Sequence, residues 1–214
     1  MDYNKKQKYY DLFDFNAKGN PFVLNKIVEG SKVLDVGCGA GNLGLGLKEK
    51  RCQAWGMDIS EESVRKSRRK ISNVFRVDLE EADKWPFTQK FDYVVLADIL
   101  EHLRNPEKVL KLAKKHLKSN GRIVVSIPNV AFVSIRLQLL MGKFEYTDWG
   151  ICDSTHVHFY TLESISKLLK DAGFSITSVE GFPLTIRKFV WLTYPLTQLF
   201  KTLLARQFII TART

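Results

Sequence analysis

The stretch VLDVGCGAGN, Val33 to Asn42, decides the fold of this chain. An apolar run ends there, Gly37, Gly39 and Gly41 follow at alternate positions, and a helical pattern begins. Glycines at such a junction let the chain turn sharply and let a ligand approach the main chain. The first turn of the following helix offers unpaired N–H groups and positive potential. The stretch therefore predicts a ligand-binding turn between a strand and a helix.

Apolar runs and helical patterns alternate along the rest of the chain. We expect strands at residues 31–37, 52–59, 73–79, 91–98, 121–128, 174–181 and 206–213, and helices at 42–51, 60–70, 105–118 and 161–173. This spacing predicts parallel β-α-β units, and only a long apolar segment separates the last two strands. The sequence therefore predicts an α/β fold: a doubly wound, Rossmann-like sheet of seven strands, mostly parallel with an antiparallel last strand, and helices on both faces.

Capping residues mark the ends of three of these helices. Ser60, Asn105 and Thr161 stand where an N-cap side chain is expected. Gly121 and Gly173 are expected just beyond the ends of the last two helices, where a left-handed residue often closes a helix.

The composition indicates a globular protein with a basic surface. A length of 214 residues suits one domain with a full core, so we expect a single domain over residues 1–214. The net charge of +10, partly clustered at 65–70 and 111–118, fits solvated helix faces, an acidic substrate, nucleic acid or an anionic membrane. Three scattered cysteines exclude a disulfide framework, and the start resembles no signal peptide, so a cytoplasmic location is expected.

One apolar segment, residues 189–200, raises the question of a membrane. It has 12 residues, contains a proline and is bounded by Lys188 and Lys201. That length is too short to span a bilayer. A peripheral contact with a membrane through this segment is the remaining expectation.

Two kinds of cofactor fit the glycine-rich turn. Gly39, Gly41 and Gly44 satisfy the dinucleotide pattern G-x-G-x-x-G, and Asp58 follows at the end of the second strand, where an acid would hold ribose hydroxyls. Asp35 argues against that reading, because an acid there would repel a pyrophosphate but can meet a cationic amine.

LDVGCGAG resembles motif I of the class I S-adenosylmethionine-dependent methyltransferases, and further motifs follow in the order of that family. They are Asp58 with Ile59, Asp78 with Leu79, FDYVVLADILEHL at 91–103, and the strand GRIVVSIPN. The resemblance covers residues 30 to about 180 and implies S-adenosylmethionine as cofactor and S-adenosylhomocysteine as product. The cofactor-binding residues that it implies are Asp35, Gly37, Cys38, Gly39, Asn42, Asp58, Ile59, Asp78, Leu79, Ala97 and Asp98. Similar proteins also place a tyrosine of an N-terminal helix over the cofactor, which points here to Tyr10.

The methyl acceptor should bind to segments outside the sheet scaffold. Two such insertions leave the carboxyl ends of strands, at about 129–160 and 182–206, and we expect them to form a lid and an acceptor pocket. Their aromatic residues suit an apolar or amphipathic acceptor, and equally suit simple burial against the core.

Two histidines are the candidate catalytic residues, His102 and His156. The run D-I-L-E-H, ending at His102, resembles families in which an acid, a glutamate and a histidine hold a divalent ion, although many relatives carry the pair without metal. His156 belongs to DSTHVHFYT, where relatives often have a histidine, and no third histidine lies nearby for zinc. We expect no bound metal, and a base or pocket role for both histidines.

The resemblance narrows the acceptor to a small molecule. The region from IPNVAF to HVHFYT resembles methyltransferases of surface-polysaccharide pathways and the methionine-biosynthesis W-like proteins. We expect a hydroxyl acceptor that is a sugar, lipid-linked or quinol-like. Nucleic acid is a less favoured partner, because no RNA-binding appendage or base-flipping motif is present. An RNA methyltransferase, a dinucleotide oxidoreductase and a non-catalytic binding partner remain as alternatives, and the oligomeric state is open.

Overall fold

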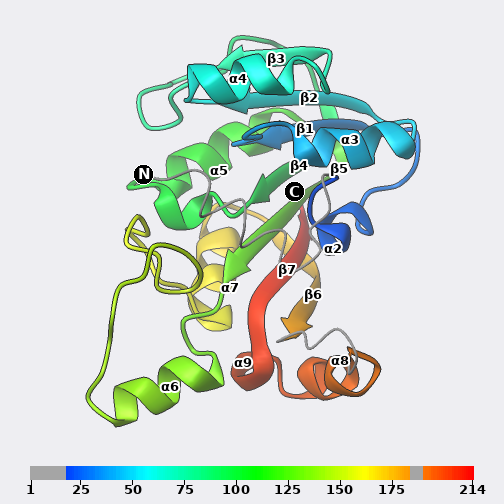
Figure 1. Cartoon of the computed structure of the whole chain (residues 1–214). Coiled ribbons are helices and arrows are strands. Elements are labelled where there is room, and N and C mark those ends of the chain that lie inside the picture. Colours follow the sequence, from blue (N-terminus) through cyan, green and yellow to red (C-terminus); the bar gives the residue numbers. More distant parts are fainter. Residues whose placement is uncertain (1–17, 184–189) are drawn as a thin grey trace.

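The computed structural model describes residues 18–183 and 190–214, and its centre is a seven-stranded sheet. The strands are β1 (Lys32–Val36), β2 (Gln53–Asp58), β3 (Asn73–Arg76), β4 (Phe91–Ala97), β5 (Leu117–Pro128), β6 (Ser175–Pro183) and β7 (Ala205–Arg213). Their order is β3-β2-β1-β4-β5-β7-β6 (Figure 1). The pairs among β1 to β5 are parallel, and β7 is antiparallel to both β5 and β6. The predicted fold class is confirmed.

Helices cover both faces of this sheet. The four predicted helices are present as α3 (Asn42–Glu49), α4 (Glu61–Ser67), α5 (Pro106–Lys115) and α7 (Leu162–Asp171). Among the described residues, five shorter or unpredicted elements join them: α2 (Pro21–Leu24), the 3-10 turn η1 (Leu100–His102), α6 (Val133–Leu140), α8 (Val190–Leu199) and α9 (Lys201–Leu204). Both predicted insertions therefore contain helices.

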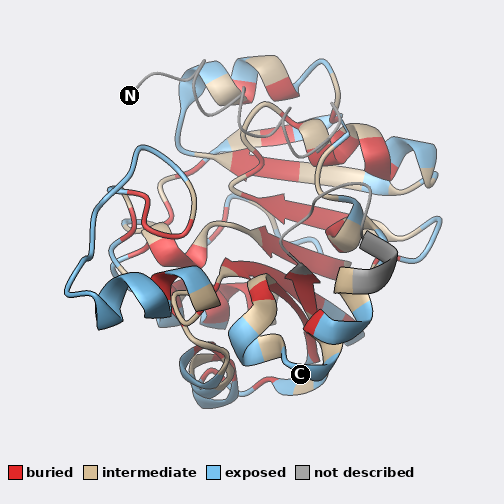
Figure 2. Cartoon of the chain, turned by 60° about the horizontal axis from the view of Figure 1, so that its bottom comes forward, coloured by how far each residue is buried: buried red, intermediate tan, exposed pale blue. Residues whose placement is uncertain are grey.

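The core lies on both sides of the sheet because successive strand residues point to opposite faces. In β5, Ile123 and Val125 pack into one apolar cluster with residues of α5 and α7. Val124, between them, packs into a second cluster with residues of α2 and α3. Figure 2 shows the strands largely buried beneath these layers. Burial on both faces explains why the strands appear in the sequence as continuous apolar runs.

The structure corrects one predicted helix end. The helix that begins at Pro106 ends at Lys115, and β5 already begins at Leu117, so Gly121 does not cap it. Gly121 instead lies where the register between β4 and β5 shifts. A Cβ atom there would come within 2.9 Å of the Phe91 carbonyl oxygen, so close contact between two strands, rather than a helix end, requires this glycine.

The predicted N-caps are confirmed. The Ser60 side chain accepts a hydrogen bond from the Ser63 N–H, and Asn105 accepts one from the Lys108 N–H. Thr161 forms a capping box with Ser164, in which each side chain accepts from the backbone N–H of the other. Gly173, with φ of +82°, closes the same helix.

Replacing Thr161 with alanine should lower the free energy of unfolding by about 1 kcal/mol, because the first turn of α7 loses its cap. In a domain of this size the unfolding midpoint should fall by about 2–4 °C. Thermal unfolding measured by circular dichroism tests this, with Thr161→Ser as the matched control that keeps the hydroxyl. An unchanged midpoint in the alanine variant would contradict the importance of the cap.

The second insertion contains apolar side chains on its surface. Leu196 and Leu199 of α8, Leu203 of α9 and Phe200 between the two helices are all exposed. Within the described ranges, no helix has the length and hydropathy needed to cross a membrane. The predicted peripheral contact through residues 189–200 stays a prediction, and Phe189 lies outside the described residues.

The order of the strands determines where a ligand can bind. From β1 the chain continues outward to β2 and β3, and then returns to the other side of β1 at β4. Helices on opposite sides of this switch point leave a crevice at the carboxyl ends of the strands. The glycine-rich turn after β1 and the segment 98–102 after β4 both begin at this edge.

Candidate active site

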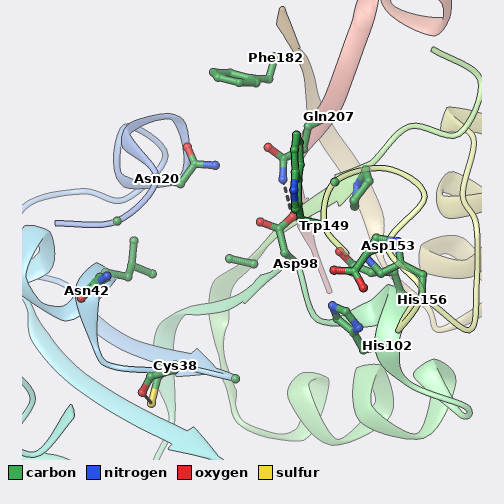
Figure 3. A pocket seen from close by; sticks show the side chains of 18 of the residues that line it. Asn20, Cys38, Asn42, Asp98, His102, Trp149, Asp153, His156, Phe182 and Gln207 are labelled. Atoms are coloured by element: carbon green, nitrogen blue, oxygen red, sulfur yellow. Dashed lines mark hydrogen bonds between the residues drawn. The ribbon is translucent and has the colours of Figure 1, made fainter. Parts of the chain in front are cut away.

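A cavity of about 330 Å³ opens at the carboxyl ends of β1 and β4. Figure 3 shows Cys38 and Asn42 on one side of it, and His102, Asp153 and His156 on the other. The predicted site residues that line it are Asp35, Gly37, Cys38, Gly39, Asn42, Ala97, Asp98, His102 and His156. The fold thus gathers nine positions, spread over more than a hundred residues of sequence, around one space.

The glycine-rich turn is held in a conformation that only glycine adopts readily. Gly37, Gly39 and Gly41 have φ of +72°, +51° and +75°. A Cβ on Gly41 would lie 2.9 Å from the Cβ of Ser67, so this glycine lets α4 pack closely. A Cβ on Gly39 would meet nothing within 4 Å, so the main chain is open to the cavity there. This open backbone fits the approach of a cofactor.

Asp58, at the end of β2, fastens the turn to the sheet. One carboxylate oxygen accepts from the Gly39 N–H at 2.8 Å and the other accepts from the Ser60 N–H at 2.8 Å. Its neighbour Ile59 is 57% exposed, and neither residue is among those that line the cavity. The predicted contacts of these two residues with a ribose and an adenine stay predictions.

Of the remaining predicted cofactor residues, Asp78 and Leu79 do not line the cavity. Asp78 lies beyond the end of β3 and accepts a hydrogen bond from the Glu80 N–H, and Leu79 is packed in the core. Tyr10 lies outside the described residues. The roles assigned to these three residues stay predictions.

Asp35 is a buried carboxyl in the cavity wall, 3% exposed. Burial and the nearby charge of Asp58 raise its pKa from 3.8 to about 7. A cation placed in the cavity would offset both effects and favour the carboxylate. The site is therefore electrostatically suited to a positively charged ligand at this position.

Asp98 is held by two side chains that the sequence did not identify. Its Oδ1 accepts from the Ser126 hydroxyl at 2.8 Å and from the Gln207 amide, which Figure 3 shows pointing toward it. Asp98 has φ of +52°, an uncommon conformation for an aspartate. Burial raises its pKa, whereas the two hydrogen bonds act in the opposite direction. The only sequence signal that could have marked Ser126 and Gln207 is a polar residue within an apolar strand, as in IVVSIP and RQFIIT.

Three residues form a second chemical group at the far end of the cavity, which we call the histidine cluster: Glu101, His102 and His156. Potential ligand atoms of the three lie within 4.8 Å of one another. The two imidazole rings meet edge to face, with centroids 4.8 Å apart. The two predicted catalytic histidines are therefore in contact, although they lie 54 positions apart in the sequence.

The hydrogen bonds of both rings indicate their tautomers. The Nδ1 of His102 lies 3.2 Å from the Thr155 carbonyl oxygen, and the Nδ1 of His156 lies 3.1 Å from the Ile151 carbonyl oxygen. A carbonyl oxygen can only accept, so each Nδ1 must donate. In the neutral rings this leaves both Nε2 atoms as proton acceptors.

The histidine cluster has the donor atoms of a metal site as well as those of a base. Two imidazoles whose other ring nitrogen donates to a carbonyl, together with a buried carboxylate, suit a divalent ion. In this cluster His156 takes the place that the sequence pattern gave to Asp98. The expectation that no metal binds stays a prediction. His158 contributes nothing to the cluster, since its Nε2 lies near the Arg104 carbonyl oxygen.

Comparisons with known proteins match this chain to methyltransferases. The sequence model of a family described as "Methyltransferase domain" matches residues 7–179. A ubiquinone biosynthesis O-methyltransferase of Azoarcus sp. (strain BH72) is 26% identical over 172 residues, which cover 76% of this chain and 74% of the relative. The corresponding enzyme of Idiomarina loihiensis is 35% identical over 136 residues, but the match spans only 60% of this chain and 54% of the relative.

A solved structure confirms the likeness at the level of the fold. The S-adenosylmethionine-dependent methyltransferase of Mesorhizobium loti superposes with a TM-score of 0.68 at 20% identity, covering 94% of this chain and 99% of that one. The two chains therefore share the fold described above.

Proposed function

Because this chain belongs to the class I S-adenosylmethionine-dependent methyltransferases, we propose that it methylates a hydroxyl oxygen of a small molecule. The observation that carries the proposal is the pair of imidazoles at the far end of the cavity, each with Nε2 left as an acceptor. A hydroxyl must lose its proton as it is methylated, and an imidazole is a suitable base near neutral pH. Relatives that are O-methyltransferases support the same choice.

Residues at one end of the cavity bind the cofactor, and residues at the other end accept the proton of the acceptor hydroxyl. The bound cofactor supplies an electrophilic methyl group on a sulfonium. Asp35 and the open main chain at Gly39 are placed to hold its cationic end and fix its position. His102 or His156 accepts the hydroxyl proton at Nε2 from the opposite side. Alignment of the two partners supplies a large part of the rate, as in any direct displacement.

The charge of Asp35 should make cofactor binding depend on pH. Its pKa of about 7 in the free protein means that, below pH 7, a cationic ligand must displace a proton. The affinity for S-adenosylhomocysteine should therefore fall by about tenfold per pH unit below 7 and change little above it. Isothermal titration across this range measures the effect, and an affinity independent of pH would contradict it.

The same carboxyl should make the unliganded protein less stable as pH rises from about 4 to 7. In this range the unfolded chain has already lost the Asp35 proton, whereas the folded protein still holds it because its pKa is raised.

We propose that the two insertions, at about 129–160 and 182–206, form the acceptor pocket within a single domain. Trp149 and Ile151 from the first and Phe182 from the start of the second line the same cavity as the histidine cluster. Their apolar surfaces suit a quinol-like or lipid-linked acceptor more than a bare sugar. Exposed apolar side chains on α6, including Leu140 at 84% exposure, and on α8 support a peripheral contact with a lipid surface where such an acceptor would reside.

The other proposed partners have less support. Several lysines of the basic helix α5 already have protein partners: Lys108 pairs with Asp83, Lys111 with Glu107, and Lys114 donates to the Gly173 carbonyl. Such solvated pairs argue against a nucleic-acid surface on this helix.

The alternative function that we keep is that of a methionine-biosynthesis W-like protein. All three cysteines are free, which suits the cytoplasmic location that we propose.

A metal ion at this site would use the residues of the histidine cluster as ligands, so that the metal and not an imidazole would activate the acceptor. Glu101, His102 and His156 would hold it, and a divalent ion there would lower the pKa of a bound hydroxyl. We propose metal-free catalysis. The measurement is elemental analysis of the purified protein, together with turnover before and after dialysis against a chelator. Stoichiometric metal, and turnover that returns only on adding it back, would replace the base role of the histidines with ligation.

The acceptor proposal is tested by measuring methyl transfer to a matched series. Purified protein and labelled S-adenosylmethionine are incubated with a catechol or quinol bearing a short alkyl chain, with the same compound lacking the free hydroxyl, and with an amine analogue. We expect transfer only to the free hydroxyl. Preferential transfer to the amine, or binding of S-adenosylhomocysteine with no transfer to any hydroxyl, would overturn it.

A further inference from the structure

We infer that Thr155 and Asp153 are positioning residues that keep Nε2 of His102 free of a proton, so that it faces the reaction as an acceptor. The inference rests on the proposed transfer to a hydroxyl and adds two residues to its machinery. Neither residue is among the predicted catalytic or cofactor-binding positions. Both belong to DSTH, the turn that precedes His156 at the end of the first insertion.

The first step concerns the hydrogen of the Thr155 hydroxyl. Asp153 is 3% exposed, and its Oδ1 accepts from the Thr155 N–H at 2.9 Å and from the Thr155 hydroxyl at 2.7 Å. A carboxylate can only accept hydrogen bonds. The hydroxyl hydrogen is therefore directed to Asp153, and the hydroxyl oxygen is left with lone pairs for any other neighbour.

The direction of this hydrogen bond determines which nitrogen of His102 carries the hydrogen. The Thr155 hydroxyl oxygen lies 3.2 Å from His102 Nδ1, and the Thr155 carbonyl oxygen lies 3.2 Å from the same nitrogen. Both oxygens face Nδ1 as acceptors, so Nδ1 must carry the hydrogen. The opposite tautomer would place the Nδ1 lone pair against two oxygens, which costs the hydrogen bond and adds repulsion. A neutral ring held in this way has its basic lone pair on Nε2.

Backbone hydrogen bonds hold Thr155 close to His102, although the two residues lie 53 positions apart in the sequence. The N–H groups of Val157 and His158 both donate to the Glu101 carbonyl oxygen, at 2.9 and 3.1 Å. The end of the first insertion is thus joined by backbone hydrogen bonds to η1, which carries His102. The backbone of both segments therefore fixes the distance between Thr155 and the imidazole. The geometry resembles other sites in which a second group orients a base through its far nitrogen.

The test uses two substitutions and two independent measurements. Thr155→Val keeps the shape and the carbonyl but removes the hydroxyl, and Thr155→Ser keeps the hydroxyl. Nitrogen-15 spectra of the histidine rings, recorded where the rings are neutral, report the tautomer directly. Turnover kinetics and titration with S-adenosylhomocysteine report the consequence.

We expect the wild-type His102 to be the Nδ1–H tautomer, and Thr155→Val to add a measurable share of the Nε2–H form. We expect kcat to fall by about 10- to 100-fold in Thr155→Val, as for other residues that orient a functional histidine. The KM for the acceptor and the affinity for S-adenosylhomocysteine should change less than about twofold, and Thr155→Ser should restore most of kcat.

The outcomes separate this inference from the proposed function. A wild-type His102 in the Nε2–H form, or a Thr155→Val variant with unchanged tautomer and unchanged kcat, overturns the positioning role. A changed tautomer with unchanged kcat supports the positioning role and overturns His102 as the base. If Thr155→Val does not fold, the wild-type spectrum and the serine variant still decide the tautomer.

Discussion

Replacing Asp35 with asparagine should weaken the binding of S-adenosylhomocysteine by about a hundredfold. The carboxylate is the buried charge that faces the cavity beside the glycine-rich turn, and truncating one partner of a buried charge pair typically costs 2–5 kcal/mol of binding. The variant should also lose the pH dependence of binding described above. Isothermal titration measures both changes in one series.

The same substitution should leave the unliganded protein as stable as the wild type or more stable. Asparagine has nearly the shape of aspartate but carries no charge to bury near Asp58. Asp92→Asn is the matched control, because Asp92 binds the Lys32 N–H and Lys118 at the other end of β1. The control should bind the ligand normally. Equal affinity in Asp35→Asn and wild type would exclude Asp35 from the cofactor site.

Replacing His102 with alanine should lower kcat by about 10²- to 10⁴-fold, the range typical for loss of a general base. The affinity for S-adenosylhomocysteine should stay within about twofold, since His102 lies on the side of the cavity opposite Cys38 and Asn42 of the glycine-rich turn (Figure 3). His156→Ala should also reduce turnover without affecting that affinity. If the two rings act as a unit, the double variant will be little worse than the more impaired single variant.

His116 offers a matched control for these histidine substitutions. It stacks on Trp85 with ring centroids 4.8 Å apart and lines no part of the cavity. His116→Ala should therefore lower the unfolding midpoint and leave kcat per folded protein unchanged. Unchanged turnover in both His102→Ala and His156→Ala would return these residues to structural roles and remove the observation on which the hydroxyl proposal rests.

The features of the fold and the site that could be predicted from the sequence are those that depend on only a few neighbouring residues. The glycine-rich turn needs a backbone that only certain residues adopt, and Ser60, Asn105 and Thr161 cap the helices that follow them directly. Such causes act over a few residues and leave a pattern in the sequence. The order of the motifs along the chain then placed Asp35, Asp98 and His102 at one edge of the sheet.

The parts that the sequence did not predict depend on contacts between distant segments. In the sequence, Thr155 is one of several hydroxyl residues in a polar turn, and only the fold shows that it contacts His102. Gln207 is likewise an ordinary strand residue in the sequence, and only the position of β7 shows that it contacts Asp98. Gly121 was assigned to a helix end because a glycine after a helical pattern usually has that role. Only the pairing of β5 with β4 reveals the crowding that requires it.

The position of β7 has a consequence for how the protein matures on the ribosome. This strand pairs with β5 on one side and β6 on the other, and it carries Gln207 into the site. While residues 205–213 are still inside the exit tunnel, β5 and β6 lack their shared neighbour and Asp98 lacks one of its donors. A nascent chain in this condition exposes strand edges that favour aggregation. The capacity to bind cofactor and acceptor together should therefore arise only after residues 205–213 have left the tunnel and this single strand has inserted.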